Sequence, residues 1–90
     1  MVEDPFLADV ERRLREAFAP EAFTLIDESH LHAGHAGSRG GARHLRVVMV
    51  SSRFSGQGLL ARHRAVQRLL AEELRQQIHA LALELRAPGE

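Results

Sequence analysis

The strongest constraint on the fold of this chain is a change of hydrophobic period within residues 62–85. In its first part, apolar residues recur at three- and four-residue steps, as on the buried side of an α-helix. They are Val66, Leu69, Leu70, Leu74 and Ile78. From His79 the period falls to two, because Leu81, Leu83 and Leu85 alternate with other residues, as in a half-covered strand. This predicts a helix that runs almost directly into a strand, with His79 starting the core-side row where a polar ring can still reach solvent.

Three further elements are predicted before this stretch. Asp4 followed by Pro5 indicates a helix start, since Asp caps free amides and Pro suits the first turn, and an apolar stripe continues to Pro20. Strands are predicted at 23–27 and 44–50, where branched, aromatic and alternating apolar residues dominate. Leu59 and Leu60 are expected to form a short helical turn before the main helix.

The segments between these elements define the topology. Residues 29–42 hold four glycines and one large apolar residue, which predicts a long mobile loop. The strands on either side of it should pair as an antiparallel hairpin, and the crossover through the helix should make the second and third strands parallel. The expected fold is α+β: helix, strand, strand, helix, strand, with a three-stranded mixed sheet and both helices on one face.

Length and composition restrict the class of protein. Ninety residues predict one domain, 1–90, whose last residues, 87–90, form a tail. No apolar run is long enough for a membrane span, and the N-terminus has acids where a targeting peptide would be basic, so a cytoplasmic protein is expected. The chain contains no nucleophile elbow, phosphate loop or HExxH motif, which predicts a non-enzyme.

The charge is zero overall but unevenly placed. Residues 1–28 hold eight acids and three arginines, residues 29–71 hold seven arginines and no acid, and residues 72–90 hold four acids and two arginines. A basic centre of this kind could attract nucleic acid or an acidic protein face, with Arg62, Arg64 and Arg68 near the helix start as the contacts. The alternative is that folding interleaves these charges on a neutral surface.

Histidine is the main candidate metal ligand, because the chain has no cysteine. His30, His32 and His35 lie in the glycine-rich segment, and His79 opens the last strand. Their spacing alone is compatible either with metal binding or with solvated loop histidines, since structural zinc sites favour four regularly spaced ligands. His63 falls on the apolar side of the helix and is expected to be a packed residue.

Four motifs together resemble the BolA family. They are DESHLHAGHAG at 27–37, HLRVVMVSSRFSG at 44–56, LLARHRAVQRLLAEEL at 59–74 and IHALALELRAP at 78–88. The F-x-G turn, the R-H-R helix start and the I-H-A-L strand start follow one another at about the separations found in that family. The resemblance implies a fold similar to the type II KH domain, in agreement with the element order predicted from the residues.

The resemblance also implies a function. BolA proteins pair with monothiol glutaredoxins and share a 2Fe-2S cluster, so the chain would be a regulatory adaptor in cluster trafficking or iron homeostasis, itself a monomer or weak homodimer. His79 would be one iron ligand, and His32, or less well His35, the second. Two histidines can replace two cysteines on one iron, whereas a chain without cysteine needs its partner and the glutathione bound there for the sulfur ligands.

The alternative function is DNA binding, because some BolA proteins are transcriptional regulators. The chain has GQG at 56–58 where a KH domain has GxxG, which disfavours RNA binding. The basic helix start still permits phosphate contacts with DNA.

Overall fold

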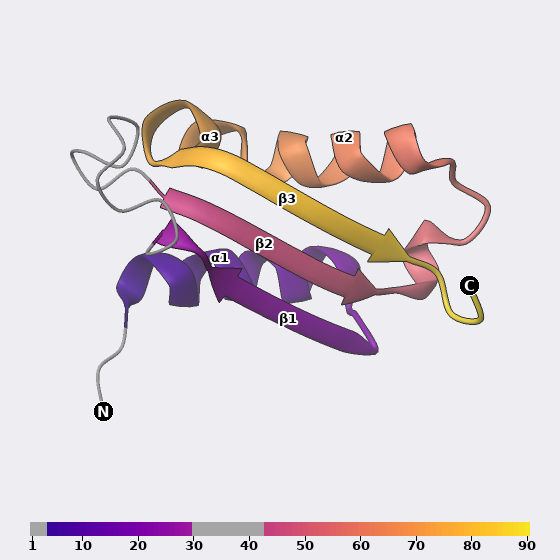
Figure 1. Cartoon of the computed structure of the whole chain (residues 1–90). Coiled ribbons are helices and arrows are strands. Elements are labelled where there is room, and N and C mark those ends of the chain that lie inside the picture. Colours follow the sequence, from indigo (N-terminus) through magenta and orange to yellow (C-terminus); the bar gives the residue numbers. More distant parts are fainter. Residues whose placement is uncertain (1–3, 30–42) are drawn as a thin grey trace.

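The computed structural model describes residues 4–29 and 43–90, and it has the predicted order of elements (Figure 1). Helix α1 (Pro5–Phe18) leads into β1 (Ala22–Asp27), and β2 (Arg43–Val50) is followed by the 3-10 turn η3 (Ser52–Phe54). Helices α2 (Leu59–Leu69) and α3 (Ala71–Gln76) then precede β3 (Ile78–Arg86). Apart from Ser29, the predicted loop 29–42 lies outside the described residues.

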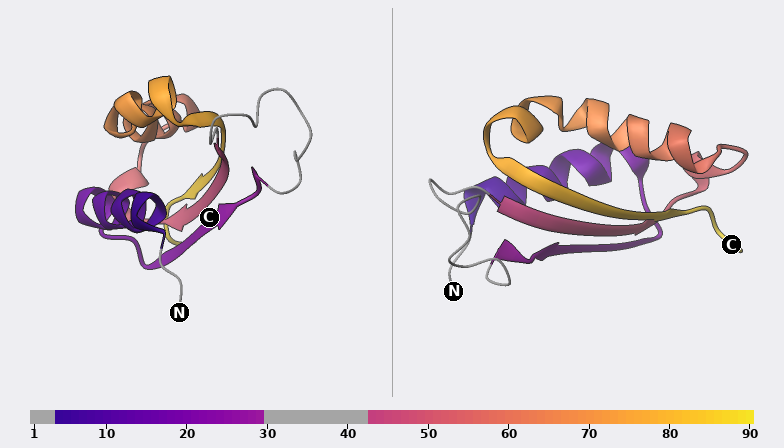
Figure 2. Two further views of the ribbon diagram at one scale, coloured as in Figure 1. Left: turned by 90° about the vertical axis from the view of Figure 1, so that its left-hand side faces the viewer. Right: turned by 45° about the horizontal axis from the view of Figure 1, so that its top comes forward.

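The three strands form one mixed sheet in the order β1-β2-β3, as predicted. Strand β1 pairs antiparallel with β2, and β2 pairs parallel with β3. All three helices lie on the same side of this sheet (Figure 2). No helix of residues 4–29 and 43–90 covers the other face of the sheet.

The core lies between the helices and the sheet. Its buried side chains come from α1, β2, η3, α2, β3 and the residues directly after α2 and β3. They are Val10, Leu14, Phe18, Val47, Met49, Phe54, Val66, Leu70, Leu85 and Ala87. Phe54 is fully buried, and its ring centroid lies 5.2 Å from that of Phe18, so the turn after β2 is anchored against the end of α1.

Helix α1 begins and ends as its sequence predicts. The Asp4 carboxylate accepts hydrogen bonds from the backbone amides of Phe6 and Leu7, with Pro5 at the first helical position. The helix ends at Ala19, which adopts a left-handed backbone conformation with φ of 43°.

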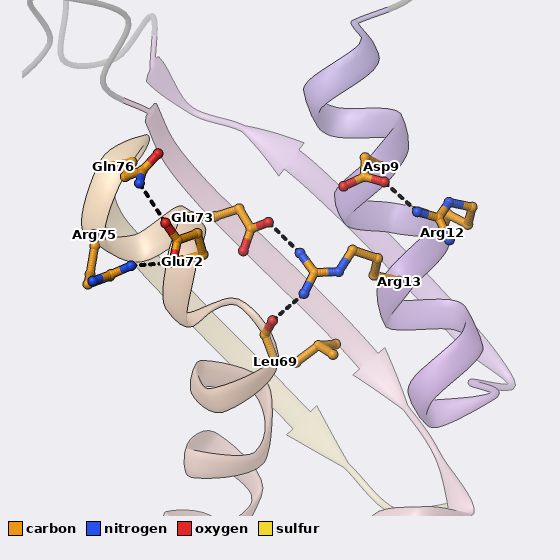
Figure 3. Close-up of polar contacts among 8 residues, drawn as sticks. All are labelled: Asp9, Arg12, Arg13, Leu69, Glu72, Glu73, Arg75 and Gln76. Atoms are coloured by element: carbon orange, nitrogen blue, oxygen red, sulfur yellow. Dashed lines mark hydrogen bonds and ion pairs between the residues drawn. The ribbon is translucent and has the colours of Figure 1, made fainter.

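The predicted single helix after the η3 turn is in fact two helices. The leucine pair 59–60 belongs to α2 itself. Leu70, with φ −102° and ψ 21°, departs from helical geometry and separates α2 from α3. The Leu69 carbonyl at this joint accepts a hydrogen bond from Arg13 Nη2 at 2.6 Å, and Arg13 also pairs with Glu73 (Figure 3). The break was not predicted because the leucine periodicity continues through it, and the compensating contact comes from α1.

Strand β3 begins with an irregularity in its pairing to β2. Arg43 is opposite Ile78, but His44 is opposite Ala80, so His79 is an extra residue. Ile78 is buried and Leu81 packs against the core although they are three residues apart, which a regular strand would not allow. The prediction that His79 starts the core-side row is therefore wrong, whereas the prediction that its ring reaches solvent is confirmed, because His79 is exposed at the irregularity.

Candidate metal centre

The exposed His79 lies beside a second histidine. Its ring centroid is 5.1 Å from that of His44, and the two ring planes are inclined by 54°. His44 is 8% exposed and lies at the beginning of the parallel pairing between β2 and β3. Two imidazoles therefore meet where two neighbouring strands begin.

A shallow hollow adjoins His79 at the junction of α3 and β3. Its volume is about 230 Å³, and it is lined by Leu74, Arg75, Gln76, Gln77, Ile78 and His79. The side chains of Arg75 and Gln76 are held on the rim by the Glu72 carboxylate (Figure 3). A partner that approaches His79 thus meets a polar concave surface.

The two ends of the segment that carries the other predicted histidines are fixed next to this pair. The Glu28 amide donates to the His44 carbonyl at 2.7 Å, and the His44 amide donates to Ser29 Oγ at 3.1 Å. Toward β3, the amide of Arg43 on the same strand donates to the carbonyl of Gln77, the residue before β3, at 2.8 Å. Ser29 and Arg43, the described residues on either side of 30–42, are therefore both fixed at the end of the sheet where β3 begins.

An ionic cluster centred on Arg43 holds the same corner together. Its guanidinium lies 2.8 Å from Asp4 and 3.1 Å from Asp27, and it stacks 5.0 Å from the ring centre of Phe6. The hydrogen bond from Arg43 lowers the pKa of Asp4. Desolvation raises the pKa of Asp27, but hydrogen bonds from Ser29 and the Arg43 charge outweigh it, so that this pKa is also lowered.

Of the predicted ligands, the structure places only His79. His30, His32 and His35 lie outside the described residues. Residues 4–29 and 43–90 contain no group of three or more histidine, cysteine or acidic side chains that could hold a metal ion. The sequence analysis did not identify His44 as a candidate. A histidine at the start of each of two strands predicted to be parallel neighbours would have indicated the pair of His44 and His79.

The three predicted basic contacts have different environments. Arg64 and Arg68 are exposed and make no ion pair with another described residue, whereas Arg62 is 5% exposed. Arg62 donates from Nε to the Gln57 carbonyl at 2.9 Å, and its two Nη groups each lie 2.6 Å from an oxygen of Glu90. Arg62 therefore holds the C-terminal residues in place, and a contact with nucleic acid is left to the other two arginines.

Residues 87–90, predicted to form a tail, are held against the rest of the domain. Ala87 is buried, and Glu90 is bound by Arg62 and by the Ala87 amide. The hydrogen bond from Arg62 lowers the pKa of Glu90 to about 2. Because arginines of the basic centre pair with acids from the chain ends, much of the charge asymmetry of the sequence is neutralised, as the interleaving alternative predicts.

Comparison with known proteins identifies the family. The family model described as BolA-like protein matches residues 14–90. The chain belongs to the BolA family. BolA-like protein 1 of Homo sapiens is 45% identical over 86 residues, which make up 96% of this chain and 61% of the human protein. The DNA-binding transcriptional regulator BolA of Escherichia coli is 47% identical over 74 residues, 82% of this chain and 68% of that protein.

Solved BolA structures have the same fold. The BolA domain of SufE1 from Arabidopsis thaliana superposes with a TM-score of 0.84 at 30% identity, covering 97% of this chain and 96% of that domain. Mouse BolA1 gives a TM-score of 0.79 at 41% identity, over 98% of this chain and 69% of that protein. In the described part of this chain, no helix has the length and apolar character needed to span a bilayer.

Proposed function

We propose that this BolA protein shares a 2Fe-2S cluster with a monothiol glutaredoxin, supplying histidine ligands to one iron. In this role it acts as a non-enzymatic cytoplasmic adaptor in cluster trafficking or iron homeostasis. The single observation that carries the proposal is the exposure of His79 at a strand bulge, beside the anchored ends of a histidine-rich segment. A bulge that turns one imidazole away from a leucine-lined strand is typical of a functional position.

The ends of the segment 30–42 bring its histidines within reach. Since an extended chain spans at most about 3.5 Å per residue, His32 lies within about 11 Å of Ser29, and His35 within about 21 Å. Ser29 is hydrogen-bonded to His44, whose ring adjoins that of His79. The family resemblance favours His32 over His35 as the second ligand, because His32 matches the family's histidine position better.

The absence of cysteine fits the division of ligands in this proposal. A 2Fe-2S cluster takes four protein or thiol ligands, and histidine pairs replace cysteine pairs on one iron in known centres. The glutaredoxin and its glutathione would supply the two thiolates, and this chain the two imidazoles. Neither protein alone then completes the cluster, so cluster sharing and heterodimer formation are coupled.

The experiment mixes the protein with cluster-loaded monothiol glutaredoxin and records visible circular dichroism. We expect the heterodimer spectrum to be lost in His79→Ala and in one of His32→Ala and His35→Ala. His63→Ala is the matched control, because His63 lies on α2 and is half-buried. Unchanged spectra in the His79 variant and in both segment variants would reject the coordination model.

DNA binding is the second candidate function, favoured by the names of the bacterial relatives and by the exposed Arg64 and Arg68. Contacts to phosphates alone would give an affinity that falls steeply with salt. Arg64→Gln with Arg68→Gln should then weaken binding to duplex DNA and flatten its salt dependence, whereas Arg53→Gln, a change away from α2, should not. Equal binding by both variants would reject this surface.

A further inference from the structure

The first turn of α2 exposes two large apolar side chains. Leu59 is 69% exposed and Leu60 is 63% exposed, against 39% for Ile26, the other exposed large apolar residue in the described part of the chain. Neither leucine belongs to the core or packs against it. Single exposed apolar residues are common on protein surfaces, but a neighbouring pair of this kind indicates a contact surface for another molecule.

The same helix carries positive charge beside the leucines. Leu60, Arg64 and Arg68 follow one another at four-residue steps and therefore form one row along α2. Both arginines are exposed. We propose that Leu59 and this row form a docking surface for an acidic peptide segment of a partner protein, with a large apolar side chain of the peptide against the leucines and its carboxylates against the arginines.

The charges around the docking surface favour an acidic partner. Residues 51–71 contain no aspartate or glutamate. Two acids from neighbouring elements are already bound, since Glu72 pairs with Arg75 and Glu90 pairs with Arg62. In addition, α2 begins without a side-chain cap, so amides of its first turn can donate to a carboxylate. A peptide that brings carboxylates therefore meets unopposed positive charge along the whole row.

A peptide accounts for both parts of the surface, whereas the other occupants account for one. Duplex DNA would place phosphates against the arginines and leave the leucines in water. A second copy of this chain, bound in an isologous contact, would bring the same arginines against each other. An acidic segment with an apolar side chain covers the leucines and also neutralises the arginines.

The docking surface lies far from His79. Arg62, near the beginning of α2, donates a hydrogen bond of 3.1 Å to the Leu85 carbonyl close to the end of β3. Leu85 lies six residues along β3 from His79, a distance of about 20 Å. Figure 1 shows that α2 and β3 begin at opposite ends of the sheet. A peptide can therefore bind at α2 while another protein contacts His79, and the inference does not rest on iron coordination.

The experiment selects a phage-displayed library of random peptides on the wild-type protein and synthesises the enriched sequences. Fluorescence anisotropy then compares their affinity for wild type, for Leu59→Ser with Leu60→Ser, and for Arg64→Gln with Arg68→Gln. Ile26→Ser is the matched control, because it removes an exposed apolar side chain from β1. Far-ultraviolet dichroism checks that each variant is folded. Duplex DNA and phosphatidylglycerol vesicles are measured as alternative ligands.

We expect enriched peptides to combine a large apolar residue with aspartate or glutamate. They should bind the leucine double variant at least about tenfold more weakly than wild type, with Ile26→Ser and His79→Ala unchanged. The arginine double variant should bind severalfold more weakly at low salt, and salt should reduce this difference.

Enriched peptides that lack acids, or that bind the leucine double variant as tightly as wild type, would overturn the inference. So would a library without enriched peptides. Leucine-dependent binding of DNA or vesicles in place of peptides would assign the surface to that ligand and overturn it as well. Leucine-dependent self-association in sedimentation would make the occupant a second copy of this chain, with the same consequence.

Discussion

Arg13 Nη2 donates a hydrogen bond of 2.6 Å to the Leu69 carbonyl, and this contact joins α1 to the break between α2 and α3. Glu73 on α3 completes the contact by pairing with the same guanidinium. Because only two residues separate the end of α3 from His79, Arg13 fixes the helix that positions the proposed ligand. The stability of the candidate site therefore depends on a side chain far from it in sequence.

Arg13→Ala should lower the free energy of unfolding by about 1.5 to 3 kcal/mol, the usual range for a partly buried hydrogen bond to a charged group. Urea denaturation measures this change. Arg12→Ala is the matched control, because its ion pairs are exposed and should contribute less than about 1 kcal/mol. Equal destabilisation by the two variants would show that the joint does not need Arg13.

Phe54→Ala should destabilise the fold by about 3 to 5 kcal/mol, since it removes a fully buried ring that packs on Phe18. Leu60→Ala, an exposed apolar residue on the first turn of α2, should change stability by less than about 0.5 kcal/mol. Thermal unfolding followed by far-ultraviolet dichroism compares the two. A small effect of the Phe54 substitution would place the core elsewhere.

The pair Arg62–Glu90 should make stability depend on pH under acidic conditions. The pKa of Glu90 is about 2 in the folded chain, against 4.5 for an unperturbed glutamate. A carboxylate with a lowered folded-state pKa contributes stability above its unfolded pKa and loses it as the pH falls toward the folded value. We expect Glu90→Gln to flatten the change in midpoint of urea unfolding between about pH 4.5 and 2, and an unaltered profile would contradict the contact.

Cluster sharing should weaken below about pH 6, because iron binds the unprotonated imidazole. The visible dichroism of the heterodimer followed through this range measures the loss. Glutaredoxin loaded with cluster in the absence of this protein is the control for acid damage to the cluster itself. A heterodimer spectrum that persists unchanged at pH 5 would argue against histidine ligation.

The sequence predicted the fold well because its determinants are local and periodic. The cap at Asp4 and the alternating leucines of β3 define their elements without information from distant residues. The break at Leu70 could not be predicted from local sequence, because the apolar period does not change there. The hydrogen-bond donor to the Leu69 carbonyl comes from Arg13, which is distant in sequence.

The candidate site was only partly predictable for the same reason. The alternation that identified β3 also placed His79 on the core side, and only the register of pairing with β2 reveals the bulge that exposes it. His44 became a candidate only when the parallel strands brought its ring to His79. Arg62 looked like part of a basic surface, but its partners Leu85 and Glu90 are distant in sequence.

The central claim is that imidazoles of this chain bind iron in the heterodimer, and pulsed electron paramagnetic resonance of the reduced cluster tests it most directly. The complex is prepared with ¹⁵N-histidine in this protein and with unlabelled glutaredoxin. We predict strong couplings to ¹⁵N from two directly bound nitrogens, reduced in number in the His79→Ala complex. Couplings that do not change when this chain is labelled would contradict the account, since every ligand would then come from the partner and its glutathione.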